Sequence, residues 1–447
     1  MRRKILLGAA GLWLSANLQA SVIGIIDSGV DIRHEALKEK VWTNPLERKN
    51  RKDDDGNGYK DDINGWNFFG NNGKVIDPKY ADLLTDDVAM FFSLQAKALE
   101  GDISEDELVW LREATTDPEF VSQLSKYGNY AHGTHVAAIA AKDNPNAQIL
   151  TARLIPVENP LEGIAGAVQR ALDEGRDLNE IVKFIVKRGL KYLAETQATS
   201  FVSIGQYMAM QNVDVANASL GMSMTQARLL IRPILDLITG GDTKAETVDE
   251  LAKYFVEESI IAQSQLVSVA PDTLYIFAAG NDGTSNDELP ISPANIQADN
   301  ALSVAATMGR NSLAVFSNFG EIVDIAAPGV AIMSAVPDNK YLQLSGTSQA
   351  APAVAAAAAM VLDENPSLSP GEIKKILLGT VDRKEFLKGK VRSAGVLNTT
   401  RAIYASRAML LGMTMPEAIA SSTEIVPDEV EEFYDADVRS RSFWIQP

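Results

Sequence analysis

The chain has 447 residues, of which 46% are hydrophobic, so it can bury a sizeable core and is long enough for one large α/β domain with insertions. Its 59 acidic residues against 41 basic ones give a formal net charge of −18, which disfavours nucleic acid or an anionic membrane surface as a partner. Cysteine is absent, which excludes disulfides, a thiol nucleophile and thiolate metal sites.

The first residues have the pattern of an export signal. Three cations at residues 2–4 precede an apolar run over Ile5–Leu14, and the small residue Ala20 follows a short polar stretch. This pattern predicts a secretory signal peptide over residues 1–20, whose apolar run is too short to be a good membrane span. We therefore expect an exported protein, periplasmic or extracellular, with no membrane span after signal removal. Leu18 is large for a residue three positions before the cleavage point, and a buried N-terminal helix is the competing interpretation.

Several short apolar runs end in polar residues. Residues 22–26 form one such run and end at Asp27, and residues 274–279 form another and end near Asn281. Helical segments lie between the runs. This alternation predicts an α/β fold with a doubly wound, mostly parallel sheet and helices on both faces. Open α/β sheets build their sites at the carboxyl ends of such strands, although Asp27 would also serve simply to open a turn.

Residues 342–352 predict a short strand, a tight turn at Gly346 and the start of an alanine-rich helix from about Pro352 to Leu362. That order places Ser348 at a helix N-terminus. Unpaired N–H groups and the helix dipole there favour the negative charge that develops when a hydroxyl attacks a carbonyl. A helix cap is the commoner role for such a serine, so catalysis requires a base and an orienting acid elsewhere in the chain.

The chain has three histidines, and two of them, His132 and His135, lie within four residues of each other. A metal site is a weak interpretation because the sequence offers no third ligand of matching type. Small and apolar residues follow over Val136–Ala141. We therefore expect a buried helix that begins at His132, after an earlier helix that Gly128 ends.

An acidic loop follows the first predicted strand. Counted from Asp53, oxygen-bearing side chains occupy positions one, three and five, glycine occupies position six, and a backbone carbonyl is available at position seven. This order is typical of the first half of a calcium-binding EF-hand loop. Position twelve is Asn64 rather than a bidentate glutamate, so the loop is not a complete EF-hand, and a solvated acidic turn is the alternative. The candidate calcium ligands are Asp53, Asp55, Asn57, Tyr59 through its carbonyl, and Asp62, with Asp61 as the alternative to Asp62 for closing the shell.

Three further stretches have helical patterns that interrupt the alternation of strands and helices. We interpret them as helical insertions in one domain of residues 21–410. Their approximate bounds are 77–126, 157–210 and 223–268. A capping box from Ser104 to Glu107 predicts a helix start within the first of them. Residues 411–447 lose periodicity and gather acidic side chains, which predicts a flexible or peripheral tail.

Four of these motifs together resemble those of the subtilisin-like serine peptidases. They are Asp-Ser-Gly from Asp27, His-Gly-Thr-His-Val-Ala from His132, Ala-Ala-Gly-Asn ending at Asn281, and Gly-Thr-Ser-x-Ala-x-Pro around Ser348. The resemblance implies that Ser348 is the nucleophile and His132 the base. It also implies that Asp27 orients the base and that the side-chain amide of Asn281 donates to the oxyanion. Gln349 replaces the usual methionine after the nucleophile.

The same resemblance implies that the backbone of Ser219, Leu220 and Gly221 binds substrate as an added strand, and that the acidic loop holds a structural calcium ion. It implies no catalytic cofactor. Relatives usually carry an N-terminal prodomain, whereas about six residues separate the predicted signal from Asp27. We therefore expect the helical insertions or the acidic tail to restrain activity.

The predicted function is an exported serine endopeptidase that acts on peptide or protein substrates, with no nucleic acid partner. A non-catalytic peptide-binding or scaffolding protein of the same fold is the alternative. An esterase or a peptide ligase would use the same nucleophile.

Overall fold

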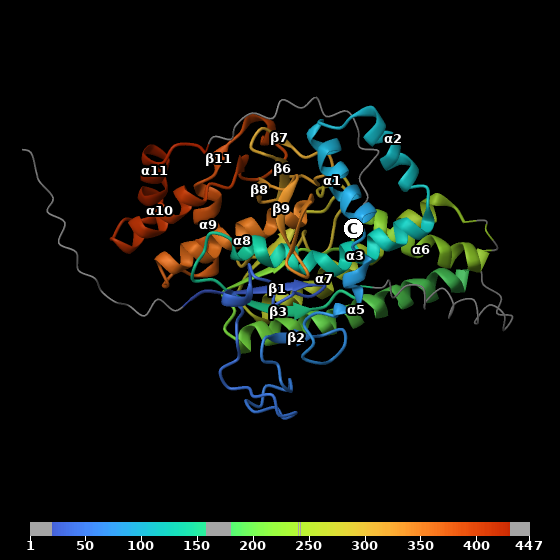
Figure 1. Ribbon diagram of the computed structural model, residues 1–447, viewed down its shortest axis with the longest axis horizontal. Coiled ribbons are helices and arrows are strands. Elements are labelled where there is room, and N and C mark those ends of the chain that lie inside the picture. The colour runs from blue at the N-terminus through green and yellow to red at the C-terminus, as the bar shows by residue number, and fades with distance from the viewer. Residues whose placement is uncertain (1–19, 158–179, 240, 242, 430–447) are drawn as a thin grey trace, which may run out of the picture.

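The computed structural model describes residues 20–157, 180–239, 241 and 243–429, and its centre is one large β-sheet (Figure 1). The strands of the sheet are β1 (Val22–Asp27), β2 (Gly65–Asn67), β3 (Gln148–Arg153), β4 (Val215–Ala218), β5 (Leu274–Ala278), β6 (Ala301–Met308), β7 (Ser312–Leu313), β8 (Ile325–Pro328), β11 (Asp382–Arg383) and β12 (Gly395–Val396). A separate antiparallel hairpin consists of β9 (Ile332–Val336) and β10 (Lys340–Leu344).

The described part of the sheet has the strand order β11-β12-β8-β6-β5-β4-β1-β3-β2, with β7 paired to β6. Its pairs are parallel except β11 with β12 and β6 with β7. The predicted α/β fold with a mostly parallel sheet is confirmed.

The central strand β1 shows why the sequence folds this way. All six of its residues are buried. Ile23 and Ile25 pack into the apolar cluster on one face of the sheet, and Val22 and Ile26 pack into the cluster on the other. Successive side chains of a strand point to opposite faces, so a continuous apolar run suits a strand that is covered on both sides. β1 pairs with β3 and β4, which places Asp27 centrally at the carboxyl edge.

Helices cover both faces of the sheet. The α-helices of the described chain are α1 (Asp86–Glu100), α2 (Glu105–Ala114), α3 (Pro118–Ala141), α5 (Glu180–Met210), α6 (Met224–Thr239), α7 (Ala245–Val269), α8 (Thr347–Glu364), α9 (Pro370–Gly379), α10 (Thr399–Leu410) and α11 (Met415–Ile425). Short 3₁₀ helices are η1 (Lys38–Lys40), η2 (Pro78–Leu83) and η3 (Glu385–Leu387). In Figure 1, α3 and α8 lie on one side of β1 and β3, and α5 lies on the other with α7 packed along it.

α3 differs from the prediction that Gly128 ends one helix and His132 begins another. It runs without interruption through both residues, so His132 lies in the interior of a long helix. Leu124, Tyr127 and Tyr130 are buried in an apolar cluster that includes side chains of α1 and of the hairpin β9–β10. Burying a large apolar side chain contributes about 1.5–3 kcal/mol, which outweighs the roughly 1 kcal/mol that a glycine costs inside a helix.

α8 begins five residues before the predicted start at Pro352. Pro352 therefore lies inside the helix, where its missing N–H leaves the carbonyl of Ser348 without a helical partner. The hydroxyl of Ser219 donates to that carbonyl at 3.1 Å. This outside donor makes the proline tolerable, and Ser348 consequently lies in the first turn of the helix.

The stretches predicted as helical insertions are helical where the structure describes them. The predicted capping box starts α2, with hydrogen bonds in both directions between its two ends. Residues 158–179 lie outside the described residues. α5 packs closely along α7 at Gly205, where an added Cβ would lie 2.8 Å from the carbonyl oxygen of Leu266.

The C-terminal segment differs from the tail predicted for residues 411–447. It includes α11, whose Ala418 is fully buried in the main core. Beyond this helix, Asp428 accepts a hydrogen bond at 2.9 Å from Arg401, which is itself 3% exposed. A helix of 11 residues rich in small side chains gives only a weak periodic signal, so composition alone suggested a tail.

Two predictions about the ends of the chain fall largely outside the described residues. These are the signal peptide, of which only Ala20 is described, and the part of the acidic tail over residues 430–447. None of the helices that the structure describes combines the length and the apolar character needed to cross a bilayer.

Candidate active site

The four residues predicted to be catalytic come from four elements that meet near the carboxyl edge of the sheet. Asp27 ends β1 and Asn281 follows β5, while His132 lies on α3 and Ser348 lies on α8. β1 and β5 flank β4 in a parallel arrangement, so their carboxyl ends open on the same edge. α3 and α8 pack against each other on one face of the sheet. This is the edge at which open α/β sheets build their sites.

Asp27 and His132 form a buried pair. Nδ1 of His132 lies 2.8 Å from Oδ1 of Asp27, whose side chain is completely enclosed. The same oxygen accepts a hydrogen bond from the backbone N–H of Ser28 at 2.7 Å. Oδ2 of Asp27 has no hydrogen-bond partner among the described residues. When Nδ1 carries the proton that faces the carboxylate, Nε2 of the neutral ring is left as a proton acceptor.

The surroundings of His132 raise its pKa above the ordinary value. Burial alone would lower that pKa because it disfavours the imidazolium, but the negative charge of Asp27 and its hydrogen bond outweigh burial. The close approach of α3 to β1 requires the glycine that follows His132. A Cβ on Gly133 would lie 2.3 Å from the carbonyl oxygen of Gly29 and 3.1 Å from Oδ1 of Asp27.

Ser348 is joined to Ser219 in both directions. Its hydroxyl donates to the carbonyl oxygen of Ser219 at 3.4 Å, and its carbonyl accepts from the Ser219 hydroxyl. Within the described chain, Ser348 and His132 share no hydrogen bond. Catalytic hydrogen bonds are often long before substrate binds and tighten in the complex. The hydroxyl lies at the positive end of α8, which favours negative charge on it.

Thr347 fixes the orientation of the Asn281 amide. Oδ1 of Asn281 accepts from the backbone N–H and from the hydroxyl of Thr347, both at 2.9 Å. The hydroxyl of Thr347 in turn accepts from the N–H of Gly280 at 3.1 Å. A Cβ on Gly346 would lie 3.5 Å from Nδ2 of Asn281 and 3.6 Å from the backbone nitrogen of Ser348. Two hydrogen-bond donors therefore border one small space next to Gly346, and stabilisation of an oxyanion requires such a pair of donors.

Gln349 borders the same space, although the motif marks it only as a replacement for methionine. Its Oε1 lies 2.7 Å from the position of a Cβ on Gly346, although the side chain is only 2% exposed. Neither atom of its amide has a hydrogen-bond partner in the part of the chain that the structure describes. A third polar group thus faces the space between the two donors.

The segment predicted to bind substrate leaves β4 next to Ser348. Ser219 is buried, whereas Leu220 is half-buried and Gly221 is exposed. No backbone hydrogen bond within the described chain involves Leu220 or Gly221. Their N–H and C=O groups are therefore available to an added strand. An extended peptide pairs with a segment of this kind through main-chain hydrogen bonds.

Residues 19–400 match the model of the subtilase family. The chain belongs to this family. It is 32% identical to alkaline elastase YaB of Bacillus sp. (strain YaB) over 195 residues, which are 43% of this chain and 42% of that relative. It is 43% identical to subtilisin BL of Lederbergia lenta over 107 residues, 24% of this chain and 38% of the relative.

These alignments show that the chain spans about two fifths of the length of the curated subtilases it matches. Among solved structures, a cold-adapted subtilisin-like serine proteinase is similar with a TM-score of 0.42 at 18% identity, covering 84% of this chain and 89% of the other. A lanthipeptide protease is similar with a TM-score of 0.46, also at 18% identity, covering 86% of each chain.

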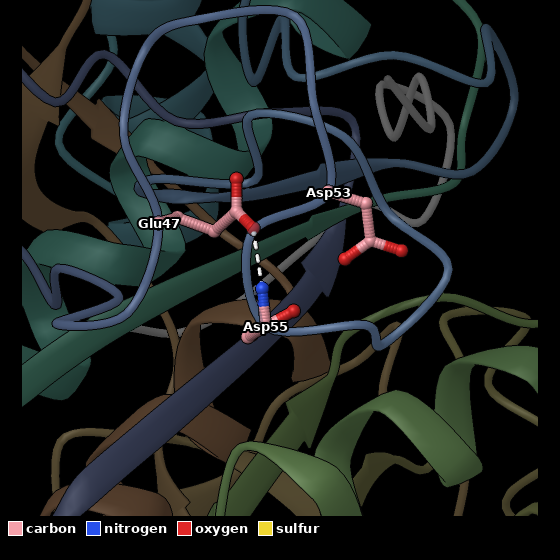
Figure 2. A group of neighbouring side chains, drawn as sticks. All are labelled: Glu47, Asp53 and Asp55. Carbon is pink, nitrogen blue, oxygen red and sulfur yellow. Dashed lines mark hydrogen bonds between the residues drawn. The ribbon is translucent and has the colours of Figure 1, made fainter.

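The acidic loop of this subtilase gathers three carboxylates, shown in Figure 2: Glu47, Asp53 and Asp55. One ligand atom of each lies within 4.8 Å of the others. Backbone N–H groups hold them in place. Glu47 accepts from the N–H of Asp55 at 3.2 Å, and hydrogen bonds from the loop glycines, chiefly Gly58, lower the pKa of Asp53. Glu47 precedes the loop pattern by six residues, and no spacing rule for calcium loops identifies it.

The other candidate ligands of the loop lie differently. The amide of Asn57 donates to both Asp55 and Asp62, at 3.1 and 3.0 Å. Asp62 is completely buried and accepts from the hydroxyl of Tyr207 on α5 at 2.8 Å. The side chain of Tyr59 packs among aromatic rings that include Tyr207, while its N–H donates to Asn57. The structure therefore brings Asp53 and Asp55 together with Glu47 and uses Asp62 to join the loop to α5.

His135 packs beneath the hairpin that precedes Ser348. Its Nε2 lies 3.1 Å from the carbonyl oxygens of both Ile332 and Leu342, and burial lowers its pKa to about 3. A ring that stays neutral can donate Nε2–H to these carbonyls across the whole neutral range of pH. His135 thus has the geometry of a structural residue that positions β9 and β10.

Proposed function

We propose that this subtilase is an exported serine endopeptidase whose catalytic residues are Asp27, His132 and Ser348. The observation that supports the proposal is the buried Asp27–His132 pair, whose contact at Nδ1 leaves Nε2 as the proton acceptor, on a helix that packs against the helix whose first turn contains Ser348. Membership of the subtilase family supports peptide or protein substrates and an exported, periplasmic or extracellular location.

In the proposed mechanism, Nε2 of His132 takes the proton of the Ser348 hydroxyl as its oxygen attacks the carbonyl carbon of a peptide bond. Asp27 stabilises the imidazolium and holds the ring in the required tautomer. The new oxyanion accepts hydrogen bonds from Nδ2 of Asn281 and the N–H of Ser348. His132 then gives its proton to the leaving amine, and water hydrolyses the acyl-enzyme by the same steps in reverse order.

Substrate binding in this proposal uses the backbone of Ser219, Leu220 and Gly221. The unpaired N–H and C=O groups of the last two residues support it, because an extended peptide needs such partners. Placing the peptide along this segment brings its carbonyl toward the space that Asn281 and Ser348 border. The Ser219 carbonyl would then release the Ser348 hydroxyl to His132.

We also propose that the acidic loop holds a structural calcium ion through Glu47, Asp53 and Asp55. The donor set fits because calcium prefers several oxygen ligands, and carboxylates this close together repel one another without a cation. The ion would neutralise this repulsion and stiffen the loop. Asn57, Tyr59 and Asp62 remain candidate ligands, although Asp62 already accepts hydrogen bonds from neighbouring side chains.

Labelling with a fluorophosphonate probe tests the proposed activity. The full chain purified after export is expected to be labelled, and Ser348→Ala is expected to remain unlabelled, because the probe reacts with an activated serine. Ser264→Ala, a change at a half-buried position of α7, is the matched control and should be labelled like the unmodified chain.

Absence of labelling in a chain with native-like circular dichroism would contradict the peptidase proposal and favour a peptide-binding protein. The calcium proposal is tested separately on the same samples. Removing calcium with a chelator is expected to lower the melting temperature of the unmodified chain, and Asp53→Asn is expected to reduce that response. An equal response in both proteins would exclude Asp53 as a ligand.

A further inference from the structure

The residue after the predicted cleavage point lies in a buried, acidic environment. Ser21 is 3% exposed and directly precedes β1. Its backbone nitrogen donates to Oδ1 of Asp363 at 3.2 Å, and its hydroxyl donates to the same oxygen at 2.6 Å. Its carbonyl accepts from the N–H of Gln148 at 3.0 Å. The nitrogen of this residue is therefore held at a fixed place beside a carboxylate.

A second carboxylate lies next to the first. Oδ2 of Asp214 accepts from the N–H of Val22 at 2.8 Å. Burial raises the pKa of Asp214, and the negative charge of Asp363 raises it further, which shows that the two carboxylates are near enough to repel. No lysine, arginine or histidine of the described chain forms an ion pair with either of them. The remaining donor to Asp363 is the neutral amide of Asn144 at 2.9 Å.

The end of α8 adds to the negative potential. Asp363 lies in the last turn of this helix, and the Ser21 hydroxyl lies 3.4 Å from the helix carbonyl of Ala359. The C-terminus of a helix carries the negative end of its dipole and favours a cation, and the last turn of α8 contains no basic side chain. Two carboxylates and a helix end thus surround one backbone nitrogen.

We propose that hydrolysis of the Ala20–Ser21 bond converts this nitrogen into an ammonium group that forms an ion pair with Asp363, with Asp214 beside it. The inference rests on the proposed export of the chain, since the cut is the one made when the signal is removed. Water supplies the hydroxyl that makes Ala20 a carboxylate, and the Ser21 nitrogen takes up protons to become an ammonium group.

The position of the cut matters because the amine must lie at this residue. Within the described chain, the backbone nitrogen of Ser21 donates to Asp363 and that of Ala20 does not, so an amine one residue upstream would lack this partner. A chain that began at Val22 would lose both hydrogen bonds from Ser21 to Asp363. The surroundings of Ser21 therefore fit the cleavage point that the sequence predicts.

The ion pair has a defined pH dependence. An α-amino group has an ordinary pKa of about 7.7–8.0, and the groups that face it here are Asp363 on α8, Asp214 before β4 and the neutral Asn144. Burial at Ser21 disfavours the ammonium form, whereas the two carboxylates and the helix end favour it, so the proposed ion pair requires that the anionic partners outweigh burial and raise the pKa of the amine in the folded state. Its stabilising contribution is complete below the ordinary pKa and is lost as pH rises through the raised one.

The test compares the melting temperatures of proteins that are expressed from the full-length sequence and purified after export, at about pH 6.5 and at about pH 10, on either side of the α-amino pKa. They are the unmodified chain, Asp363→Asn and the control Asp272→Asn, which removes an exposed carboxylate and changes the net charge equally. The intact mass of each purified protein identifies its N-terminal residue. Asp214→Asn is a milder second variant that keeps both hydrogen bonds from Ser21 to Asp363.

We expect an intact mass that corresponds to a chain beginning at Ser21. We also expect that Asp363→Asn lowers the melting temperature much more at pH 6.5 than at pH 10. Asp214→Asn should show the same trend with a smaller amplitude, and Asp272→Asn should show no trend. A deficit in Asp363→Asn that is equal at both pH values would overturn the ion pair, because lost neutral hydrogen bonds do not depend on pH in this range. A first residue other than Ser21 would also overturn it.

Fluorophosphonate labelling of the same samples separates this inference from the proposed activity. A labelled chain that begins at Ser21 but shows no pH-dependent deficit overturns the ion pair alone. A chain that keeps residues 1–20 overturns the export on which the inference rests, whether or not Ser348 is labelled.

Discussion

Two buried acidic side chains of this subtilase lie in contrasting environments. Asp27 and Asp382 are both fully enclosed, and each has a cationic or potentially cationic neighbour. Asp382 faces two arginines, Arg310 and Arg401, which are 6% and 3% exposed. Asp27 faces one histidine, His132. The cluster of Asp382, Arg310 and Arg401, called the Asp382 cluster below, has permanent charges of both signs. In the Asp27–His132 pair, by contrast, the positive charge depends on protonation of the imidazole.

The number of hydrogen bonds differs as well. Oδ1 of Asp382 accepts from Asn398 at 2.7 Å, and Oδ2 accepts from Arg310 and from the N–H of Glu429. Both oxygens are therefore satisfied, and the cluster holds the segment after α11 against the sheet. Oδ2 of Asp27 has no partner in the described chain. A saturated buried charge fixes structure, while a buried charge with an open position and a titratable partner can take part in a reaction.

The largest effect is expected from neutralising the carboxylate of Asp27. Asp27→Asn should lower kcat by about 10⁴-fold, because the amide neither stabilises the imidazolium nor enforces the tautomer that leaves Nε2 as acceptor. Peptide hydrolysis and the rate of fluorophosphonate labelling measure it. The melting temperature, measured at a pH at which His132 is neutral and the pair contributes no ionic stabilisation, is the control and should change little. A loss of activity below about tenfold would mean that the Asp27–His132 pair has a structural role, as the Asp382 cluster does.

The Asp382 cluster is expected to contribute to the free energy of unfolding. Arg401→Met removes one partner from a saturated buried network and leaves Asp382 undercompensated, which typically costs about 3–5 kcal/mol of unfolding free energy. Urea unfolding measures the change. Arg407→Met is the matched control on the same helix, since its ion pair with Glu364 is exposed and contributes at most about 1 kcal/mol. Equal effects of the two variants would contradict the distinction between saturated and exposed pairs.

The third effect concerns Nδ2 of Asn281, which has no hydrogen-bond acceptor among the described residues. Asn281→Ala should lower kcat by roughly 10²–10³-fold with little change in KM, the size known for the oxyanion asparagine of subtilisin. Asn286 is a useful contrast, because its amide already donates to the carbonyl of Ala279 at 2.9 Å. Asn286→Ala should mainly lower the unfolding free energy. If Asn281→Ala changed KM and not kcat, Nδ2 would bind the ground state rather than the oxyanion.

The sequence alone predicts the site better than the clusters that support the fold. Asp27 and Asn281 follow parallel strands and Ser348 lies in the first turn of α8, so motif and sheet order place them at one edge, whereas His132 lies inside α3 and is identified by its local motif alone. Glu47 could not be predicted as a partner of Asp53, because it joins the loop through backbone hydrogen bonds that no spacing encodes.

The same holds for the buried network around Asp382. Arg310, Arg401 and Glu429 are far apart in the sequence and belong to no motif, so only the packed structure brings them to one carboxylate. The helix boundaries that were predicted incorrectly also depended on tertiary contacts. Buried tyrosines carry α3 through Gly128, and the Ser219 hydroxyl allows α8 to include Pro352.

The smallest effect is a displacement of the pH profile. His132 must be neutral to accept a proton, and the charge of Asp27 outweighs burial and raises its pKa above the ordinary value of about 6.5. The acidic limb of kcat/KM should therefore lie above pH 6.5, with activity falling tenfold for each pH unit below it. His135 should not contribute, because its pKa is about 3. Asp27→Asn should move the limb to lower pH in the residual activity.

The same ionisation affects stability in the opposite direction. A histidine whose pKa is raised by folding stabilises the protein fully below its unfolded pKa of about 6.5, and this contribution is lost as pH rises through the folded value. The Asp27–His132 pair thus stabilises the fold most where the base is protonated and inactive. The unfolding free energies of the unmodified chain and of His132→Gln should converge at pH values above the folded pKa of His132. A difference that is the same at every pH would mean that the variant loses stability through packing alone.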